Sequence, residues 1–219
     1  MAQSITRLSG VNSLSGTLPS SVIANSTLDN ITALPSAVPT GKPILLSTAT
    51  ASSSASIEFT SGIDSTYDIY QFEFINCHPA TDSVSFHFQS STDGGSNYNV
   101  TTTSTTFNGA HSEDDTTVAS LFYVTGTDQA QGTGYQFING GIGNDNDQSV
   151  SGEMQIFNPS STTFVKHYII RSQGLVASDQ SVDFYTAGYF NTTSAINAIS
   201  FKFSSGNIDS GDIKLYGIS

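Results

Sequence analysis

The stretch of sequence that decides the fold is Ser83-Val84-Ser85-Phe86-His87-Phe88-Gln89. Large apolar residues alternate with polar ones along it, and successive side chains of a β-strand point to opposite faces. We therefore expect Val84, Phe86 and Phe88 to face a core, and His87 and its polar neighbours to face outward. This pattern is typical of a half-buried strand in an antiparallel sheet.

The same period of two recurs in about ten short runs along the chain. They cover residues 43–48, 55–60, 68–75, 83–89, 118–125, 150–157, 164–170, 182–189, 198–203 and 212–218. Turn-forming sequences separate the runs, among them Asn108-Gly109 and Asn139-Gly140-Gly141. We predict an all-β fold over residues 43–219, an antiparallel β-sandwich of jelly-roll type with about 8–10 strands; closure into a barrel is the alternative.

Residues 1–42 differ from the rest of the chain, because aliphatic residues are scattered there among Ser, Thr, Asn and Gly, and three prolines interrupt them. Proline removes a backbone donor and favours an extended conformation in the residue before it. We expect an extended N-terminal arm that docks on a larger assembly or on another subunit; a disordered tail is the alternative. The residues expected at this assembly interface are Leu14, Leu18, Val22, Ile23, Leu28 and Ile31.

The composition indicates an acidic surface with few charges. Charged residues make up 11% of the 219 residues, and the formal net charge is −12. A phosphate backbone would be repelled, so we expect no direct contact with nucleic acid. No apolar run approaches the ~18 residues of a membrane helix, and no secretory signal peptide is visible, so we expect no membrane insertion. Cys77 is the single cysteine, and we expect it to fill space in the core.

The titratable residues show no pattern that predicts catalysis or a metal centre. The four histidines lack metal-ligand spacing. Asn144-Asp145-Asn146-Asp147 offers hard oxygens, but it lacks the glutamate and the spacing of a full calcium loop. We found no nucleophile elbow, no phosphate-binding loop and no pair of carboxylates that stands out. We therefore expect no enzyme activity, no cofactor and no metal.

Aromatic and amide side chains in the expected loops are suited to carbohydrate contact. An aromatic ring stacks on the C–H groups of a sugar, and amides bond its hydroxyls. The residues that we expect to contact a host-surface glycan, should the chain bind one, are Tyr67, Asn97 and Tyr98.

Five stretches of the chain resemble structural proteins of tailed bacteriophages. They are residues 59–70 (FTSGIDSTYDIY), 90–98 (SSTDGGSNY), 158–167 (NPSSTTFVKH), 187–198 (AGYFNTTSAINA) and 199–218 (ISFKFSSGNIDSGDIKLYGI). The resemblance implies a tail-fibre, head-fibre or capsid-decoration protein with a C-terminal β-sandwich. It also implies partners among capsid or tail proteins and assembly into the virion in the host cytoplasm. It transfers no catalytic residue.

We therefore predict a structural component of a bacteriophage virion. Its arm would dock on the capsid or tail, and its sandwich would be exposed as a fibre or decoration. We expect a homo-oligomer, with a trimer favoured, because closed cyclic symmetry is usual among such proteins. The first alternative is a glycan-binding module for receptor recognition, and the second is a hydrolase of surface polysaccharide.

Overall fold

The computed structural model describes residues 42–218, and these contain thirteen β-strands and no helix. Every pairing between neighbouring strands is antiparallel, which confirms the predicted all-β antiparallel fold. A helix able to cross a membrane is absent from this part of the chain. The six interface residues predicted in the arm lie outside the described residues.

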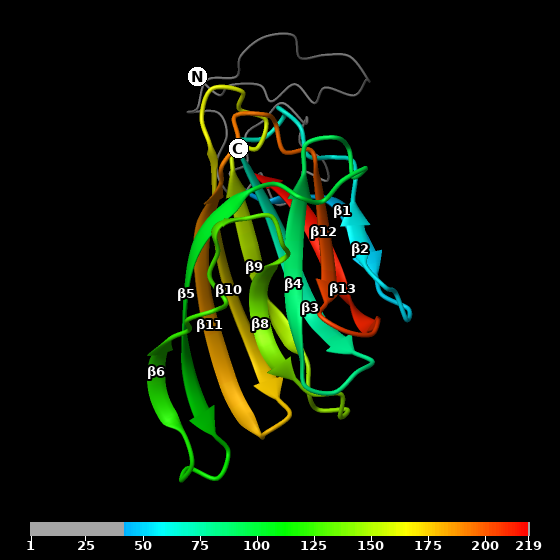
Figure 1. Cartoon of the computed structure of the whole chain (residues 1–219). Helices are drawn as coiled ribbons and strands as arrows, with labels where there is room; N and C mark the ends of the chain where they lie inside the picture. Colours follow the sequence, from blue (N-terminus) through cyan, green and yellow to red (C-terminus); the bar gives the residue numbers. More distant parts are fainter. Residues whose placement is uncertain (1–41, 219) are drawn as a thin grey trace, which may run out of the picture. The chain divides into compact units, whose positions relative to one another are not determined.

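Most of the strands form the larger of two layers (Figure 1). Its order is β1-β13-β3-β9-β10-β11-β5, and β6 and β7 both pair with the remaining edge of β5. The strands are β1 (Ile44–Thr50), β13 (Ile208–Ile218), β3 (Ile69–Pro79), β9 (Val150–Phe157), β10 (Lys166–Val176), β11 (Gln180–Phe190), β5 (Thr102–Ser112), β6 (Ala119–Tyr123) and β7 (Ala130–Gly132).

The smaller layer has the order β2-β12-β4-β8. Its strands are β2 (Ile57–Phe59), β12 (Ala198–Phe203), β4 (Val84–Ser91) and β8 (Gln136–Ile142). One residue pair, Val176 with Ile142, links β10 to β8 and joins the two layers into a single sheet that is nearly closed.

Buried polar groups reinforce this junction between β8 and β10. The Ser172 hydroxyl donates to the backbone carbonyl of Ile138 at 2.9 Å. The side-chain amide of Asn139 donates to the Ser172 hydroxyl at 3.1 Å. These bonds give partners to polar groups that would otherwise be buried without them, which would cost about 1–3 kcal/mol each.

Aromatic side chains fill the space between the layers. Phe86 and Phe88 of β4 are fully buried, as predicted. Phe74 of β3 meets Phe86 edge to face, with 5.4 Å between the ring centroids. Phe88 meets Tyr168 of β10 in the same way at 5.2 Å. The apolar face of β4 therefore packs against the larger layer. Its polar face is not fully open to solvent as expected, because Gln89 is 1% exposed and its amide donates to the backbone carbonyls of Thr133 and Gly134 at 3.0 and 2.7 Å.

Cys77 is fully buried near the end of β3, as predicted. Burial raises the pKa of its thiol to about 12. Because the thiolate is the reactive form, a thiol that stays protonated in the core is inert toward thiol reagents at neutral pH.

The described residues have more strands than the 8–10 predicted, and two of the predicted turns are wrong. Asn108-Gly109 lies inside β5, and Asn139-Gly140-Gly141 lies inside β8. Strands on both sides of β5 pair with Asn108 and hold it extended. Gly140 makes room for the ring of Phe137, because a Cβ at this glycine would lie 2.6 Å from that ring.

Truncating either core ring of β4 should threaten the fold. Phe86→Ala or Phe88→Ala should lower the free energy of unfolding by about 3–5 kcal/mol, because each leaves a cavity. His87→Ala, on the opposite face, should cost less than half as much. Urea denaturation followed by circular dichroism measures all three variants, and a larger loss for His87→Ala would contradict the assignment of faces.

Candidate functional site

The outer face of the larger layer carries a row of side chains that the strand register aligns. Directly paired residues of antiparallel strands share a face. The register places one residue of each strand in line from β3 across β9, β10, β11 and β5 to β6. We call these residues the outer row: Glu73, Glu153, Arg171, Tyr185, Phe107 and Tyr123.

The centre of the outer row is a stack of flat groups. The rings of Phe107 and Tyr185 are parallel within 4°, with 5.0 Å between their centroids. The guanidinium carbon of Arg171 lies 5.2 Å from the Tyr185 centroid. Asp183 accepts a hydrogen bond from Arg171 at 2.9 Å and another from the Tyr185 hydroxyl at 3.2 Å. This carboxylate raises the pKa of Arg171 and holds the guanidinium in place.

A groove of about 400 Å³ adjoins this stack. Its lining includes Ile169, Ala187 and Thr105, which form the next row of paired residues across β10, β11 and β5. The side chains of Ala187 and Thr105 are short beside those of the outer row. Gln155 and Glu153 of β9 also line the groove. The site thus combines apolar surface with amide, carboxylate and guanidinium groups, which is the usual composition of a small-ligand site.

Glu73 and Glu153 of the outer row are direct cross-strand partners on β3 and β9. We did not identify this pair from the sequence, because the two residues lie in runs that are far apart along the chain. Each occupies a polar position in a predicted strand, so the alternation of polar and apolar residues indicates only that each side chain faces outward. Only the pairing of β3 with β9 brings the two carboxylates together.

Of the predicted glycan contacts, Tyr67 lies beside the larger layer. Its ring meets that of Tyr70 edge to face at 5.8 Å. It also lies against Gly217 of β13, where a Cβ would come within 2.3 Å of the ring. Tyr67 therefore contributes to packing at this end of β3 and β13.

Asn97 and Tyr98 follow β4, and no ring contact or hydrogen bond among the described residues joins them to Tyr67. The Asn97 amide donates to the Asp93 carboxylate at 2.7 Å, and the Asn97 backbone N–H donates to it at 2.9 Å. Burial, assisted by the charge of Glu58, raises the pKa of Tyr98 to about 12. Its hydroxyl is therefore neutral at physiological pH.

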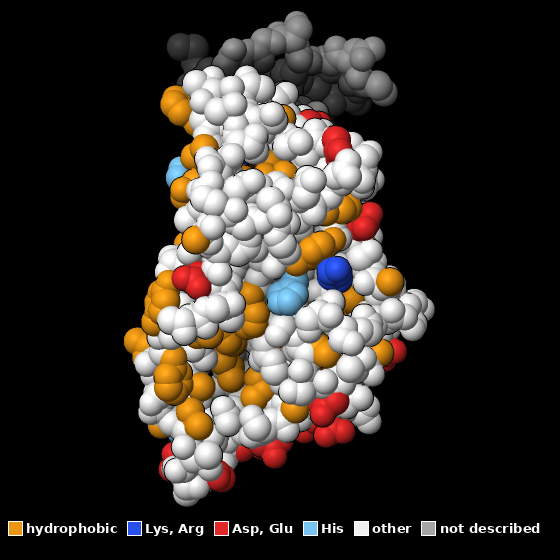
Figure 2. Space-filling model, in the orientation of Figure 1, with side chains coloured by type: hydrophobic (Ala, Val, Ile, Leu, Met, Phe, Trp, Pro, Cys, Tyr) orange, Lys and Arg blue, Asp and Glu red, His pale blue; other side chains and the backbone are white. Residues whose placement is uncertain are grey.

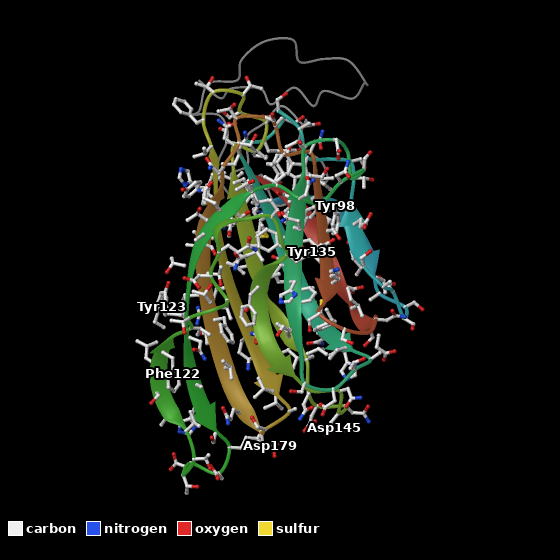
Figure 3. The ribbon with its side chains drawn as sticks, viewed as in Figure 1. Tyr98, Phe122, Tyr123, Tyr135, Asp145 and Asp179 are labelled. Carbon is white, nitrogen blue, oxygen red and sulfur yellow. The ribbon has the colours of Figure 1, made fainter. Side chains whose placement is uncertain are left out.

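The outer face of the smaller layer presents a compact polar cluster around Tyr135 (Figure 3). The Lys202 ammonium lies 4.1 Å from the centroid of the Tyr135 ring, and the Tyr135 hydroxyl donates to Ser200 at 3.1 Å. His87 pairs with Lys202 across β4 and β12. Burial, and then the charge of Lys202, lower the pKa of His87 to about 4, so the imidazole is neutral at pH 7.

Acidic side chains gather at the lower end of the view in Figure 2, where Figure 3 labels Asp145 and Asp179. Asp145 lies in the Asn144 to Asp147 segment, and its backbone carbonyl accepts a hydrogen bond from His78 Nε2 at 3.1 Å. Within residues 42–218, no three His, Cys, Asp or Glu side chains are placed to share a metal ion.

Comparison with known proteins gives no match. No protein-family model fits the chain, and no curated protein or solved structure shows significant similarity to it.

The lowered pKa of His87 predicts a pH-dependent stability. The unfolded chain binds a proton near pH 6.5, whereas the folded protein resists protonation down to about pH 4. Between these values the unfolded state holds more protons, so stability falls as the pH is lowered. Acidification from pH 7 to about 4.5 should lower the free energy of unfolding of the wild type more than that of His87→Gln. The difference between the two losses should be at most about 3 kcal/mol. Urea denaturation at both pH values measures the difference, and an identical loss in the two proteins would contradict the prediction.

Proposed function

We propose that this chain is a non-enzymatic structural component of a bacteriophage virion. Residues 1–42 dock on the capsid or tail, and residues 43–219 form a jelly-roll-type sandwich that is exposed as a fibre or decoration. Its partners are other virion proteins and further copies of itself, and assembly takes place in the host cytoplasm. The five stretches that resemble phage structural proteins support this proposal.

The strand order supports the jelly-roll part of the proposal. In an eight-stranded jelly roll, one sheet contains the first, eighth, third and sixth strands, and the other contains the second, seventh, fourth and fifth. The eight strands that correspond are β1, β2, β3, β4, β8, β9, β12 and β13. The order β1-β13-β3-β9 follows the first pattern, and the order β2-β12-β4-β8 follows the second. The remaining strands, β10, β11, β5, β6 and β7, extend the larger layer beyond β9. Viral capsid proteins and lectins both use this architecture.

The observation that carries the structural role is the concentration of exposed apolar residues on one part of the domain. Within residues 42–218, nine large apolar residues are exposed, and six of them lie on β5, β6, β10 and β11. They are Phe107, Leu121, Phe122, Tyr123, Ile169 and Tyr185. Clustered apolar surface on a soluble domain marks an interaction site. An assembly protein requires such a surface, whereas an isolated domain has no use for it.

Antibodies raised against the purified full chain allow a direct test of this proposal. Immunogold labelling of purified phage particles should place the chain at regular positions on the head or tail. Quantitative mass spectrometry should find it in fixed stoichiometry through a density gradient. Its absence from purified particles would contradict the proposal.

The docking role of the arm is tested in the same particles. The full chain with Leu14→Ser and Leu18→Ser should keep its circular dichroism spectrum but compete poorly with wild type for incorporation. Matched changes of polar arm residues, Ser13→Ala and Ser15→Ala, should compete normally. Equal incorporation of the two variants would show that attachment does not use these leucines.

A glycan-binding function is the second candidate, and the groove beside the outer row favours it. The groove presents Tyr185 and Phe107 next to the polar groups of Arg171, Gln155 and Glu153. Sugars bind proteins through this combination, with apolar C–H faces against aromatic rings and hydroxyls bonded by amides and charged groups.

A glycan array followed by calorimetry on the strongest binder tests this candidate. Tyr185→Ala should weaken binding about tenfold or more, which corresponds to about 1.4 kcal/mol. Asn97→Ala should leave binding unchanged if the groove is the site. Weaker binding by Asn97→Ala, with unchanged binding by Tyr185→Ala, would favour the loop site of Asn97 and Tyr98. If the wild type instead releases reducing sugar from the glycan and Glu153→Gln does not, the protein is a hydrolase.

A further inference from the structure

The strand β6 is an exposed edge of the larger layer. All five of its residues are exposed, including Leu121 (74%), Phe122 (45%) and Tyr123 (56%). Figure 3 shows Phe122 and Tyr123 at the outer margin of the molecule. One edge of β6 pairs with β5, and no described strand pairs with the other. An apolar, unpaired edge is a template for another strand.

The hydrogen-bond pattern shows which backbone groups face this free edge. The Val124 N–H donates to the Thr106 carbonyl at 3.1 Å, and the Ser112 N–H donates to the Val118 carbonyl at 2.9 Å. Hydrogen-bonded and non-bonded pairs alternate in an antiparallel ladder. Residues 120 and 122 therefore direct their backbone groups to β5, whereas residues 119, 121 and 123 direct theirs to the free edge.

We propose that β6 pairs antiparallel with β6 of a second copy of this chain, about a two-fold axis at Leu121. In this register Leu121 lies opposite its own copy, and Ala119 lies opposite Tyr123. These are the residues whose backbone groups face the free edge, so each can form the hydrogen bonds of a bonded pair. A small residue then faces a large one on each side of the axis, which lets the side chains of the two copies fit together.

Charge and strand shape place the contact between two copies at β6 and not at the other edge. Each copy carries a net charge of −12, so two copies repel each other, and contact is least unfavourable along a strand that has no charged side chain. The sequence of β6, ASLFY, contains no charged residue. The opposite edge strand, β1, also exposes Ile44 and Leu45, but a shift of register between Leu45 and Ser47 interrupts its pairing with β13. Such irregularities discourage pairing at an edge.

The association is a property of the chain in solution and does not depend on the proposed virion function. Analytical ultracentrifugation of the full chain, from low micromolar to submillimolar concentration, should show a monomer–dimer equilibrium. Added salt should strengthen it, because salt screens the repulsion between two acidic copies. A chain that stays monomeric throughout this range, or that associates without a dimer, would overturn the proposal.

Leu121→Pro tests the backbone pairing. It removes an N–H that faces the free edge and leaves the donors to β5 in place, as edge strands permit. It should weaken dimerisation about tenfold or more while the circular dichroism spectrum stays unchanged. The matched control Leu45→Lys, at the other exposed edge, should dimerise like the wild type. Equal dimerisation of Leu121→Pro and wild type would overturn the proposal.

Leu121→Cys tests the register. A hydrogen-bonded pair places the two Cα atoms about 5.5 Å apart, which is within the range for a disulfide. Mild oxidation should therefore give a covalent dimer on a non-reducing gel, and Cys77 should not compete because it is buried. Ser120→Cys faces Phe122 of the second copy and should stay monomeric on the same gel. Cross-linking of Ser120→Cys but not of Leu121→Cys would overturn the proposed register.

Discussion

The packing of Phe201 between the two layers is the contact on which the rest of the structure depends. The centroid of its ring lies 5.1 Å from that of Phe72 and 5.2 Å from that of Phe74, both on β3. Within its own layer the ring also contacts Phe59, Phe86 and Phe88. Each aromatic pair contributes roughly 0.5–1.5 kcal/mol beyond the burial of apolar area. Because β12 pairs with both β2 and β4, a displaced Phe201 would disturb three strands at once.

This core also determines what the outer face presents. Tyr168 and Ile170 are buried, so the period of two directs Ile169 and Arg171 of the same strand outward. A shift of one residue in β10 would bury Arg171 and expose Tyr168. The stack of Arg171 on Tyr185, and the position of the groove beside it, therefore follow from apolar packing on the other face of the sheet.

Strands with regular alternation of apolar and polar residues could be predicted from the sequence, whereas mostly polar strands could not. Strict alternation identified β4 and its buried face, because three large apolar residues there share one period. It did not identify β5, whose residues are mostly threonine, serine and asparagine. In β5 the pairing with β11 over its whole length holds the strand extended and overrides the turn preference of Asn108-Gly109. The outer row could not have been predicted, since it requires Phe107 of β5 in register with Tyr185 of β11.

The burial of Cys77 also makes the fold insensitive to the redox conditions around it. The thiol is fully enclosed and is the single cysteine of the chain. No disulfide within the chain has to form for residues 42–218 to fold, and the buried thiol of Cys77 is shielded from oxidation and exchange. The redox state of this one thiol is therefore the same in a reducing and in an oxidising medium.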